Sequence, residues 1–461
     1  MSTITARRAL ASLSAKSTAA SHAITPSSTA AASKNSRNHG GCLSDVALRS
    51  NNSKFWNGIS QAPADPILGI IEEFAKSSSP QRVNLSVGAY RDNNGLPYVL
   101  PSIRMASAIV YQQKLDEEYA PIVGTANYVS LVKKFLYGSF STGADLIKED
   151  RIAMAQSISG TGALKLVADF LKKWSPYESR AIYLSNPTWA NHANIFGSSG
   201  IEPRQYTYFN RDTNAIDMEL LLDDLSNAER GSAVLLHACC HNPTGLDPTE
   251  EQWRDIVDVI SQRELIPVVD IAYQGFQSGH LSQDLYLLKL VSEKCTEGLL
   301  PTAFVCQSFA KNMGLYGERV GSVSLITPSK EVTNNVDSQM KRIVRSIYSS
   351  PPVHGSRLVE TVLSDESIFA QWNKDVQLMA NRIKSMRQEL HGYLTRHSDL
   401  NWDHIVEQNG MFCYTGLNKD QMTHLKDDFH VYATMDGRFS MAGLNTSNVE
   451  YVANAMDKVT R

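Results

Sequence analysis

Short apolar runs that alternate with amphipathic helical patterns are the feature that most constrains the fold of this 461-residue chain. Four runs are typical of buried strands, because each is short, apolar and bounded by turn residues; they cover residues 180–185, 233–238, 266–270 and 303–308. The intervening segments 161–174 and 250–262 place their apolar residues on one helical side. This alternation predicts a layered α/β fold with a mostly parallel central sheet flanked by helices.

The C-terminal part of the chain has a different pattern. An amphipathic helix is expected over residues 379–396, strands over 410–414 and 438–442, and a last helix over 449–460. These elements predict a second, smaller α+β domain. We expect residues 51–100 to form an N-terminal arm and part of the small domain, 101–360 the large domain, and 361–461 the rest of the small domain.

Residues 1–50 differ from the rest in composition. They contain 11 Ser, six basic residues and one acid, with no apolar stretch of the kind that marks a secretory signal. Such a segment is typical of an organelle transit peptide, and we expect no fixed fold in it. Its first residues favour the mitochondrial matrix, while the Ser and Thr content keeps a plastid address open. An untargeted tail is the alternative.

Charge, hydropathy and cysteine spacing together argue against nucleic-acid binding, a membrane span and a zinc or disulfide scaffold. The net charge of the chain is −3, and without residues 1–50 the remaining 38 basic and 46 acidic residues give −8. No basic footprint for nucleic acid is present, and no apolar run is long enough to span a bilayer. The six Cys include no Cys-x-x-Cys motif, so that neither a disulfide scaffold nor a zinc ribbon is expected. An anionic substrate would therefore need a local cationic cluster.

The run SFAKNMGLYGERVG, from Ser308 to Gly321, carries the clearest chemical signal. Lys311 follows the end of a strand-like run, beside small residues, where its side chain can reach into a cleft. Burial would lower the pKa of this amine, and an unprotonated amine can form a Schiff base with a carbonyl. Arg319 can supply a fixed cation for a phosphate. Taken singly, each also fits a solvated side chain or a surface ion pair with Glu318.

This run resembles the cofactor-lysine motif of the aspartate aminotransferases, in the fold-type I group of pyridoxal-phosphate enzymes. Further runs resemble other segments of that family in the same order: NLSVGAYR at 84–91, EYAPIVG at 118–124, QSISGTGAL at 156–164, NPTWANH at 186–192, HACCHNPTG at 237–245, DIAYQGF at 270–276, VRSIYSSPP at 344–352 and GRFS at 437–440. The matches extend from about residue 55 to the C-terminus and are most like the mitochondrial form. The resemblance implies pyridoxal 5'-phosphate as cofactor and no metal.

The resemblance also implies which residues hold the cofactor, with Lys311 bonded to it. Its phosphate is expected to contact Ser159, Gly160, Thr161, Ser308, Arg319 and, from the neighbouring subunit, Tyr119. Independently of the family, residues 159–161 open a predicted helix, whose free N–H groups and dipole favour an anion. An ordinary helix cap would fit the same three residues.

The cofactor ring is expected to lie over the end of the apolar strand 266–270. A carboxylate from Asp270 would keep the ring nitrogen protonated and so strengthen the ring as an electron sink. By resemblance, Asn242 and Tyr273 donate to the phenolic oxygen, Trp189 packs on the ring, and His192 orients Asp270. Two departures from the family pattern, Ser86 and Ser350, bear on the geometry of the loops around them.

Substrate choice is expected to depend on two arginines, because a guanidinium grips a carboxylate with two parallel hydrogen bonds. By resemblance, Arg438 binds the α-carboxylate and Arg345 of the other subunit binds the distal one, while Gly88, Trp189 and Asn242 also line the site. The implied reaction transfers an amino group between L-aspartate and 2-oxoglutarate by ping-pong Schiff-base chemistry. Lys311 would move the Cα proton, and the active sites would be shared within a homodimer.

Three alternatives remain open at this point. An aminotransferase for aromatic amino acids or kynurenine would share the fold, and Arg345 discriminates it from the dicarboxylate reading. A binding protein on the same scaffold would have a secondary ligand-binding role. A nucleotide-binding protein that uses residues 160–162 is disfavoured, because position 165 is Lys and the Gly-x-Gly-x-x-Gly pattern is incomplete.

Overall fold

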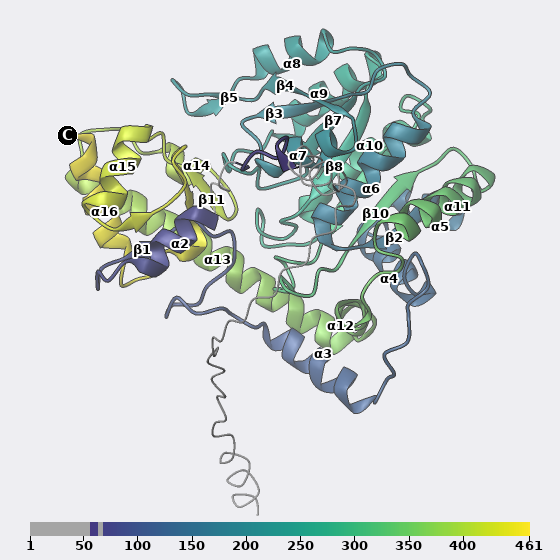
Figure 1. Ribbon diagram of the computed structural model, residues 1–461, viewed down its shortest axis with the longest axis horizontal. Coiled ribbons are helices and arrows are strands. Elements are labelled where there is room, and N and C mark those ends of the chain that lie inside the picture. The colour runs from purple at the N-terminus through teal and green to yellow at the C-terminus, as the bar shows by residue number, and fades with distance from the viewer. Residues whose placement is uncertain (1–55, 63–67) are drawn as a thin grey trace, which may run out of the picture. The chain divides into compact units, whose positions relative to one another are not determined.

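The computed structural model of the chain describes residues 56–62 and 68–461. The expected transit peptide, residues 1–50, lies outside these ranges. The chain divides into two compact units, Met1–Pro63 and Ala64–Arg461. Residues 56–62 of the first unit are exposed. The second unit contains the architecture described below, and its elements are labelled in Figure 1.

A seven-stranded sheet forms the centre of the second unit, in the order β2-β10-β9-β8-β7-β3-β4. Strand β10 is antiparallel to both of its neighbours, and the other pairs in the sheet are parallel. The predicted α/β class with a mostly parallel sheet is therefore confirmed. The strands are β2 (Ile152–Ser157), β3 (Ala181–Asn186), β4 (Glu202–Thr207), β7 (Ala233–His237), β8 (Ile266–Ile271), β9 (Phe304–Ser308) and β10 (Gly321–Ile326).

Both faces of the sheet are covered over most of its width, which explains why its inner strands are mostly apolar, whereas the edge strand β4 is polar and largely exposed. Every residue of β2, β7, β8, β9 and β10 is buried. Successive side chains of a strand point to opposite faces. In β7, Val234 and Leu236 accordingly belong to one apolar cluster and Ala233 and Leu235 to another. A sheet buried in this way is typical of parallel α/β folds.

Helices surround the sheet, and their ends follow local capping chemistry. Helix α9 (Glu250–Gln262) begins at a capping box, in which Thr249 and Gln252 bond to each other's backbone, and it matches the predicted bounds. Helix α6 (Ser159–Trp174) begins two residues before the predicted 161. The remaining helices of this part are α3 (Pro101–Gln112), α4 (Ala126–Tyr137), α5 (Ser141–Lys148), α7 (Asn191–Ser198), α8 (Met218–Ser226), α10 (Tyr286–Thr296), α11 (Lys330–Ile347) and α12 (Val353–Ser364).

The C-terminal elements pack around the long helix α13 (Glu366–His397), seen in green in Figure 1. They are α14 (His404–Glu407), β11 (Phe412–Tyr414), α15 (Lys419–Asp427), β12 (Val431–Tyr432), β13 (Arg438–Ser440) and α16 (Val449–Thr460). Strand β1 (Val83–Asn84), which follows α2 (Leu68–Lys76), pairs in parallel with β12. A segment from before residue 100 thus lies beside the C-terminal elements. The exact domain boundaries stay a prediction.

Within the described ranges, no helix is long and apolar enough to cross a bilayer.

Antiparallel pairing of β11 with β13 sets Phe412 opposite Ser440 and Tyr414 opposite Arg438. This small ribbon carries side chains of the C-terminal part to the ends of the central strands. The site described next therefore draws on both regions.

Candidate active site

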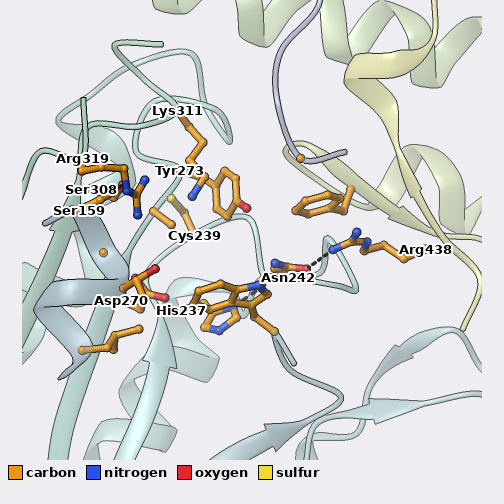
Figure 2. Close-up of a pocket in the computed structure, with 17 residues that line it drawn as sticks. Ser159, His237, Cys239, Asn242, Asp270, Tyr273, Ser308, Lys311, Arg319 and Arg438 are labelled. Atoms are coloured by element: carbon orange, nitrogen blue, oxygen red, sulfur yellow. Dashed lines mark hydrogen bonds between the residues drawn. The ribbon is translucent and has the colours of Figure 1, made fainter. Parts of the chain in front are cut away.

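A cavity of about 250 Å³ opens where the parallel strands of the central sheet end. Ligands of open α/β sheets bind at this edge, outside the carboxyl ends of the strands. Figure 2 shows the cavity and ten labelled residues that line it. Twelve of the residues predicted from the sequence line it together: Gly88, Ser159, Gly160, Thr161, Trp189, Asn242, Asp270, Tyr273, Ser308, Lys311, Arg319 and Arg438.

Lys311 carries the amine of the cavity. It lies three residues after the end of β9, and its Nζ is 5.2 Å from the ring centre of Tyr273. Burial lowers the pKa of Lys311, with a further decrease from the charge of Arg319 and an opposing increase from Asp270. A buried amine with a lowered pKa is the form that attacks a carbonyl or accepts a proton.

Hydroxyl groups and a guanidinium gather at one end of the cavity. Ser159 Oγ lies 2.9 Å from Ser308 Oγ, and Figure 2 shows Arg319 next to both. Residues 159–161 form the first turn of α6, rather than a loop before it, so that the N-terminus of this helix faces the group. A Cβ at Gly160 would lie 3.4 Å from Ser308 Cβ, which shows how closely these segments approach. This donor set fits a phosphate.

Asp270 lines the cavity near the end of β8. Its Oδ2 lies 3.4 Å from His192 Nε2, and the Nδ1 of the same ring lies 2.8 Å from Thr188 Oγ1. Burial by itself raises the pKa of Asp270, but contact with His192 and the charges of His237 and Lys311 bring it below its ordinary value. Asp270 is therefore held as a carboxylate, suited to pair with a protonated ring nitrogen.

His237 stands beside this pair as a neutral imidazole. Its Nδ1 accepts the backbone N–H of Asn242 at 3.1 Å, so that the ring proton is on Nε2. Burial lowers the pKa of His237 to about 3. His192, His237 and Asp270 bring ligand atoms within 4.8 Å of one another. The proton on His237 Nε2 makes that atom a donor, which opposes metal ligation by this group.

Arg438 supplies a cation on the side that faces the C-terminal elements. Its Nη1 donates to Asn242 Oδ1 at 3.3 Å and its Nη2 to the carbonyl of Ser86 at 2.9 Å, both neutral oxygens. Its Nε has no hydrogen-bond partner, although the residue is only 5% exposed. Burial lowers the pKa of Arg438. A buried guanidinium with spare donors suits a carboxylate ligand.

Three predicted residues do not line the cavity. Arg345, near the end of α11, is exposed and donates to Ser349 Oγ at 2.5 Å. Tyr119 is 84% exposed. His192 is fully buried and contacts Asp270 from outside the lining. The roles expected for Arg345 and Tyr119 therefore require a second subunit.

Five lining residues were not among the predicted site residues: Leu164, His237, Cys239, Ala272 and Phe412. Phe412 lies in a correctly predicted strand, and its ring centre is 4.3 Å from Arg438 Cζ. A Cβ at Gly88 would lie 2.8 Å from Phe412 Cζ, so that the ring occupies the space that glycine leaves. Cys239 also lines the cavity, within the HACCHNPTG run. Alternation along residues 410–414 was the available signal for Phe412, but it does not identify a partner.

Comparison with known proteins agrees with this geometry. The model of the class I and II aminotransferase family matches residues 80–456. The mitochondrial aspartate aminotransferase of Dictyostelium discoideum is 44% identical over 89% of this chain and 95% of its own length. The mitochondrial enzyme of Arabidopsis thaliana is 44% identical over 89% and 93%, respectively. The chain belongs to the aspartate aminotransferase family.

Solved structures of aminotransferases share the fold. The cytoplasmic aspartate aminotransferase of Saccharomyces cerevisiae superimposes with a TM-score of 0.85 at 42% identity, covering 89% of this chain and 99% of that one. An aromatic-amino-acid aminotransferase of Burkholderia pseudomallei, covalently bound to pyridoxal phosphate, gives 0.83 at 38% identity, covering 88% and 99%. These are fold-type I aminotransferases, as is this chain.

The cofactor of this aminotransferase family is pyridoxal phosphate, and the cavity fits it. Hydroxyls, a guanidinium and a helix N-terminus suit the phosphate, the carboxylate of Asp270 suits the ring nitrogen, and Lys311 supplies the amine. The chain is therefore a pyridoxal-phosphate-dependent transaminase. The assignment of individual contacts remains a proposal.

Proposed function

We propose that this protein is an aspartate aminotransferase, which transfers an amino group reversibly between L-aspartate and 2-oxoglutarate, giving oxaloacetate and L-glutamate. One observation carries the proposal: the buried amine of Lys311 shares a cavity with the carboxylate of Asp270 and the buried guanidinium of Arg438. An amine, an acid for the ring nitrogen and a cation for a substrate carboxylate are the three groups that such a transfer needs.

The cofactor contacts follow from the same cavity. Phosphate binding is assigned to Ser159, Gly160, Thr161, Ser308 and Arg319, with Tyr119 of the second subunit. Asp270, oriented by His192, is assigned to the ring nitrogen; Asn242 and Tyr273 are assigned to the phenolic oxygen, and Trp189 to the ring face. Bound pyridoxal phosphate supplies an electron sink for the carbanion that forms when the substrate Cα loses its proton.

Lys311 moves the proton in the proposed mechanism. Lys311 Nζ would hold the cofactor, and it would become free beside the substrate Cα once the substrate amine took its place. Lys311 Nζ would then accept the Cα proton as general base and deliver it to C4′ of the cofactor as general acid. Its lowered pKa favours the unprotonated form of Nζ, which the first of these steps needs. The keto product leaves before the second substrate binds, so that ping-pong kinetics are expected.

Arg438 and Arg345 set substrate choice in this proposal. Arg438 binds the α-carboxylate, and Arg345 of the second subunit binds the distal carboxylate. Structural neighbours include aromatic-amino-acid aminotransferases, among them one from Psychrobacter sp. B6 cocrystallised with aspartic acid. Activity on phenylalanine is therefore the comparison that tests whether a dicarboxylate is preferred.

A homodimer is part of the proposal, since Tyr119 and Arg345 act across a subunit boundary. The segment 96–119, which includes α3, exposes large apolar side chains that a partner would cover: Leu96, Val99, Met105, Tyr111, Leu115 and Tyr119. Exposed apolar patches of this kind mark protein interfaces. A two-fold axis would place the same segment on both sides.

We propose the mitochondrial matrix as the location of the protein. The relatives from Dictyostelium discoideum and Arabidopsis thaliana are named mitochondrial, and residues 1–50 have the composition of a transit peptide. Fusion of residues 1–50 to a fluorescent reporter tests this. Mitochondrial import of the reporter is expected, and plastid or cytosolic fluorescence would contradict the location.

The decisive experiment is an absorbance spectrum of the purified protein with added cofactor, before and after addition of L-aspartate. For wild type we expect a visible absorbance band that shifts when aspartate is added. For Lys311→Ala we expect this band to be absent. Lys172→Ala is the matched control, because Lys172 is an exposed lysine that donates to Gly200 O. A wild-type band that responds to phenylalanine and not to aspartate would overturn the substrate assignment.

A further inference from the structure

Arg387 is a buried cation that the proposed chemistry does not use. It lies on α13, is 3% exposed and donates to backbone carbonyls of α14, of the loop after α14 and of β11. Its side chain also interacts with the thiol of Cys413, and its Nε has no hydrogen-bond partner. The acceptors are Ile405 and Asn409, both at 3.1 Å, Gly410 at 2.9 Å, and Phe412. A guanidinium is costly to bury unless hydrogen bonds replace its water. Here four backbone carbonyls replace the water around the guanidinium, and Arg387 in turn holds these carbonyls in place.

The last of these carbonyls belongs to the residue on which Arg438 lies. The Phe412 ring is 4.3 Å from Arg438 Cζ and meets the Tyr273 ring edge-on at 5.9 Å. The ring also fills the space above Gly88, where a Cβ would be 2.8 Å away. Phe412 therefore supports the flat side of the Arg438 guanidinium.

Only a few other contacts fix the direction of Arg438. Nη1 and Nη2 donate to Asn242 Oδ1 and Ser86 O, while Nε is without a partner. A shift of the supporting ring would tilt the guanidinium plane away from a bidentate carboxylate. Binding geometry of this kind tolerates only about 0.5 Å of displacement.

We propose that Arg387 is a positioning residue for the substrate α-carboxylate: it gathers the carbonyls of residues 405–412 and so sets the Phe412 ring that aims Arg438. This inference rests on the proposed function. Arg387 itself lines a separate cavity of about 120 Å³ and not the active-site cavity. Of the four residues whose carbonyls it binds, Phe412 is the one that lines the active-site cavity.

The test compares KM with kcat in Arg387→Met. KM for aspartate and KM for 2-oxoglutarate should rise together, by roughly tenfold, because both substrates present an α-carboxylate to Arg438. We expect kcat to change by less than about threefold, since Lys311 and Asp270 are untouched. The dissociation constant of pyridoxal phosphate, measured by absorbance, should stay at the wild-type value.

Arg387→Lys gives the same test should Arg387→Met fail to fold, because an ammonium cannot bridge four carbonyls. The matched control is Asp375→Asn, which removes another buried charge from α13; Asp375 Oδ2 accepts the backbone N–H of Ser102 at 2.9 Å, outside the active-site cavity. This control should lower the melting temperature and leave both KM values unchanged.

A double-mutant cycle identifies the route of the effect. Phe412→Leu alone should raise both KM values, and Arg387→Met should add nothing further to it. The inference would be overturned if the rise in KM of the double variant equalled the product of the rises in the two single variants. Wild-type KM values in both Arg387 variants would also overturn it. A wild-type protein that makes no oxaloacetate from aspartate would instead contradict the proposed function.

Discussion

His192 Nε2 lies 3.4 Å from Asp270 Oδ2, and Thr188 Oγ1 holds the other nitrogen of the same ring at 2.8 Å. Asp270 is thus oriented from behind by a side chain that has no exposed surface. The contact also keeps the pKa of Asp270 below its ordinary value against the opposing effect of burial. The residue that orients the Asp270 carboxylate, His192, therefore does not itself line the active-site cavity.

Loss of this contact should weaken cofactor binding. In His192→Phe, the pKa of Asp270 should rise and the dissociation constant of pyridoxal phosphate should increase roughly tenfold, which corresponds to one pKa unit. A spectrophotometric titration of cofactor-free protein measures this. His424→Phe replaces an exposed histidine that pairs with Asp428, and it should bind the cofactor as wild type does. Equal constants for both variants would count against the orienting role.

Gly88→Ala should disturb the substrate side of the cavity. The new Cβ would lie 2.8 Å from Phe412 Cζ, so that the ring must move. Overpacking of this kind costs about 1–3 kcal/mol. We expect KM for aspartate to rise at least fivefold in steady-state assays. Gly69→Ala, where no atom lies within 4 Å of the added Cβ, is the control and should keep the wild-type KM.

Shared active sites can be tested with two inactive chains. Lys311→Ala lacks the amine and Arg345→Ala lacks the cation that the second subunit is expected to lend. A hybrid dimer contains one site with both groups intact. Unfolding and refolding of an equal mixture should therefore restore about a quarter of wild-type activity, since half of the dimers are hybrids. If the mixture stays as inactive as the separate chains, Arg345 does not act across the boundary.

Asp247 should make stability depend on pH between about 4 and 6. It accepts the backbone N–H groups of Cys240 and His241 at 2.8 and 2.9 Å, and burial raises its pKa to about 6. The folded state then binds more protons than the unfolded state in this window, so that this group's contribution to the free energy of unfolding falls as pH rises.

Asp247→Asn removes that contribution. Relative to wild type, the free energy of unfolding of the variant should increase by about 1–3 kcal/mol between pH 4 and pH 6.5. Urea unfolding of cofactor-free protein, followed by circular dichroism at several pH values, measures the difference. Asp212→Asn alters an exposed acid and should run parallel to wild type. A constant difference between Asp247→Asn and wild type would refute the prediction.

The central strands could be predicted from the sequence because they are buried on both faces. The expected strand 266–270 corresponds to β8, Ile266–Ile271, where every residue is buried. The long helix was predicted only from residue 379, although α13 begins at Glu366. Its start is set by Asp365, whose side chain accepts the backbone N–H of Ile368. The first half of the helix buries Ile368, Trp372, Val376 and Met379 at helical spacing, with the charged Asp375 among them, so that the apolar pattern extends further than was predicted.

The candidate site was predictable where chemistry is local and not where it depends on long-range contacts. Lys311, Asp270 and residues 159–161 each follow or open an element that the sequence already indicates. The bond from Arg438 to Ser86 O spans 352 residues. Strand alternation shows which side chains share a face, but it cannot show that Phe412 lies against Arg438 and Gly88. Tyr119 and Arg345 still await a test with a second subunit.

The pairing of β1 with β12 has a consequence for synthesis. Val83 pairs with Val431, and the carbonyl of Ser86 accepts a hydrogen bond from Arg438. Residues synthesised early therefore cannot make these contacts until the C-terminal residues have been synthesised. The last strand of the central sheet ends at Ile326, so that the sheet can be complete before Arg438 of the cavity lining has been made. A chain that ends before residue 438 therefore lacks a guanidinium that lines the active-site cavity.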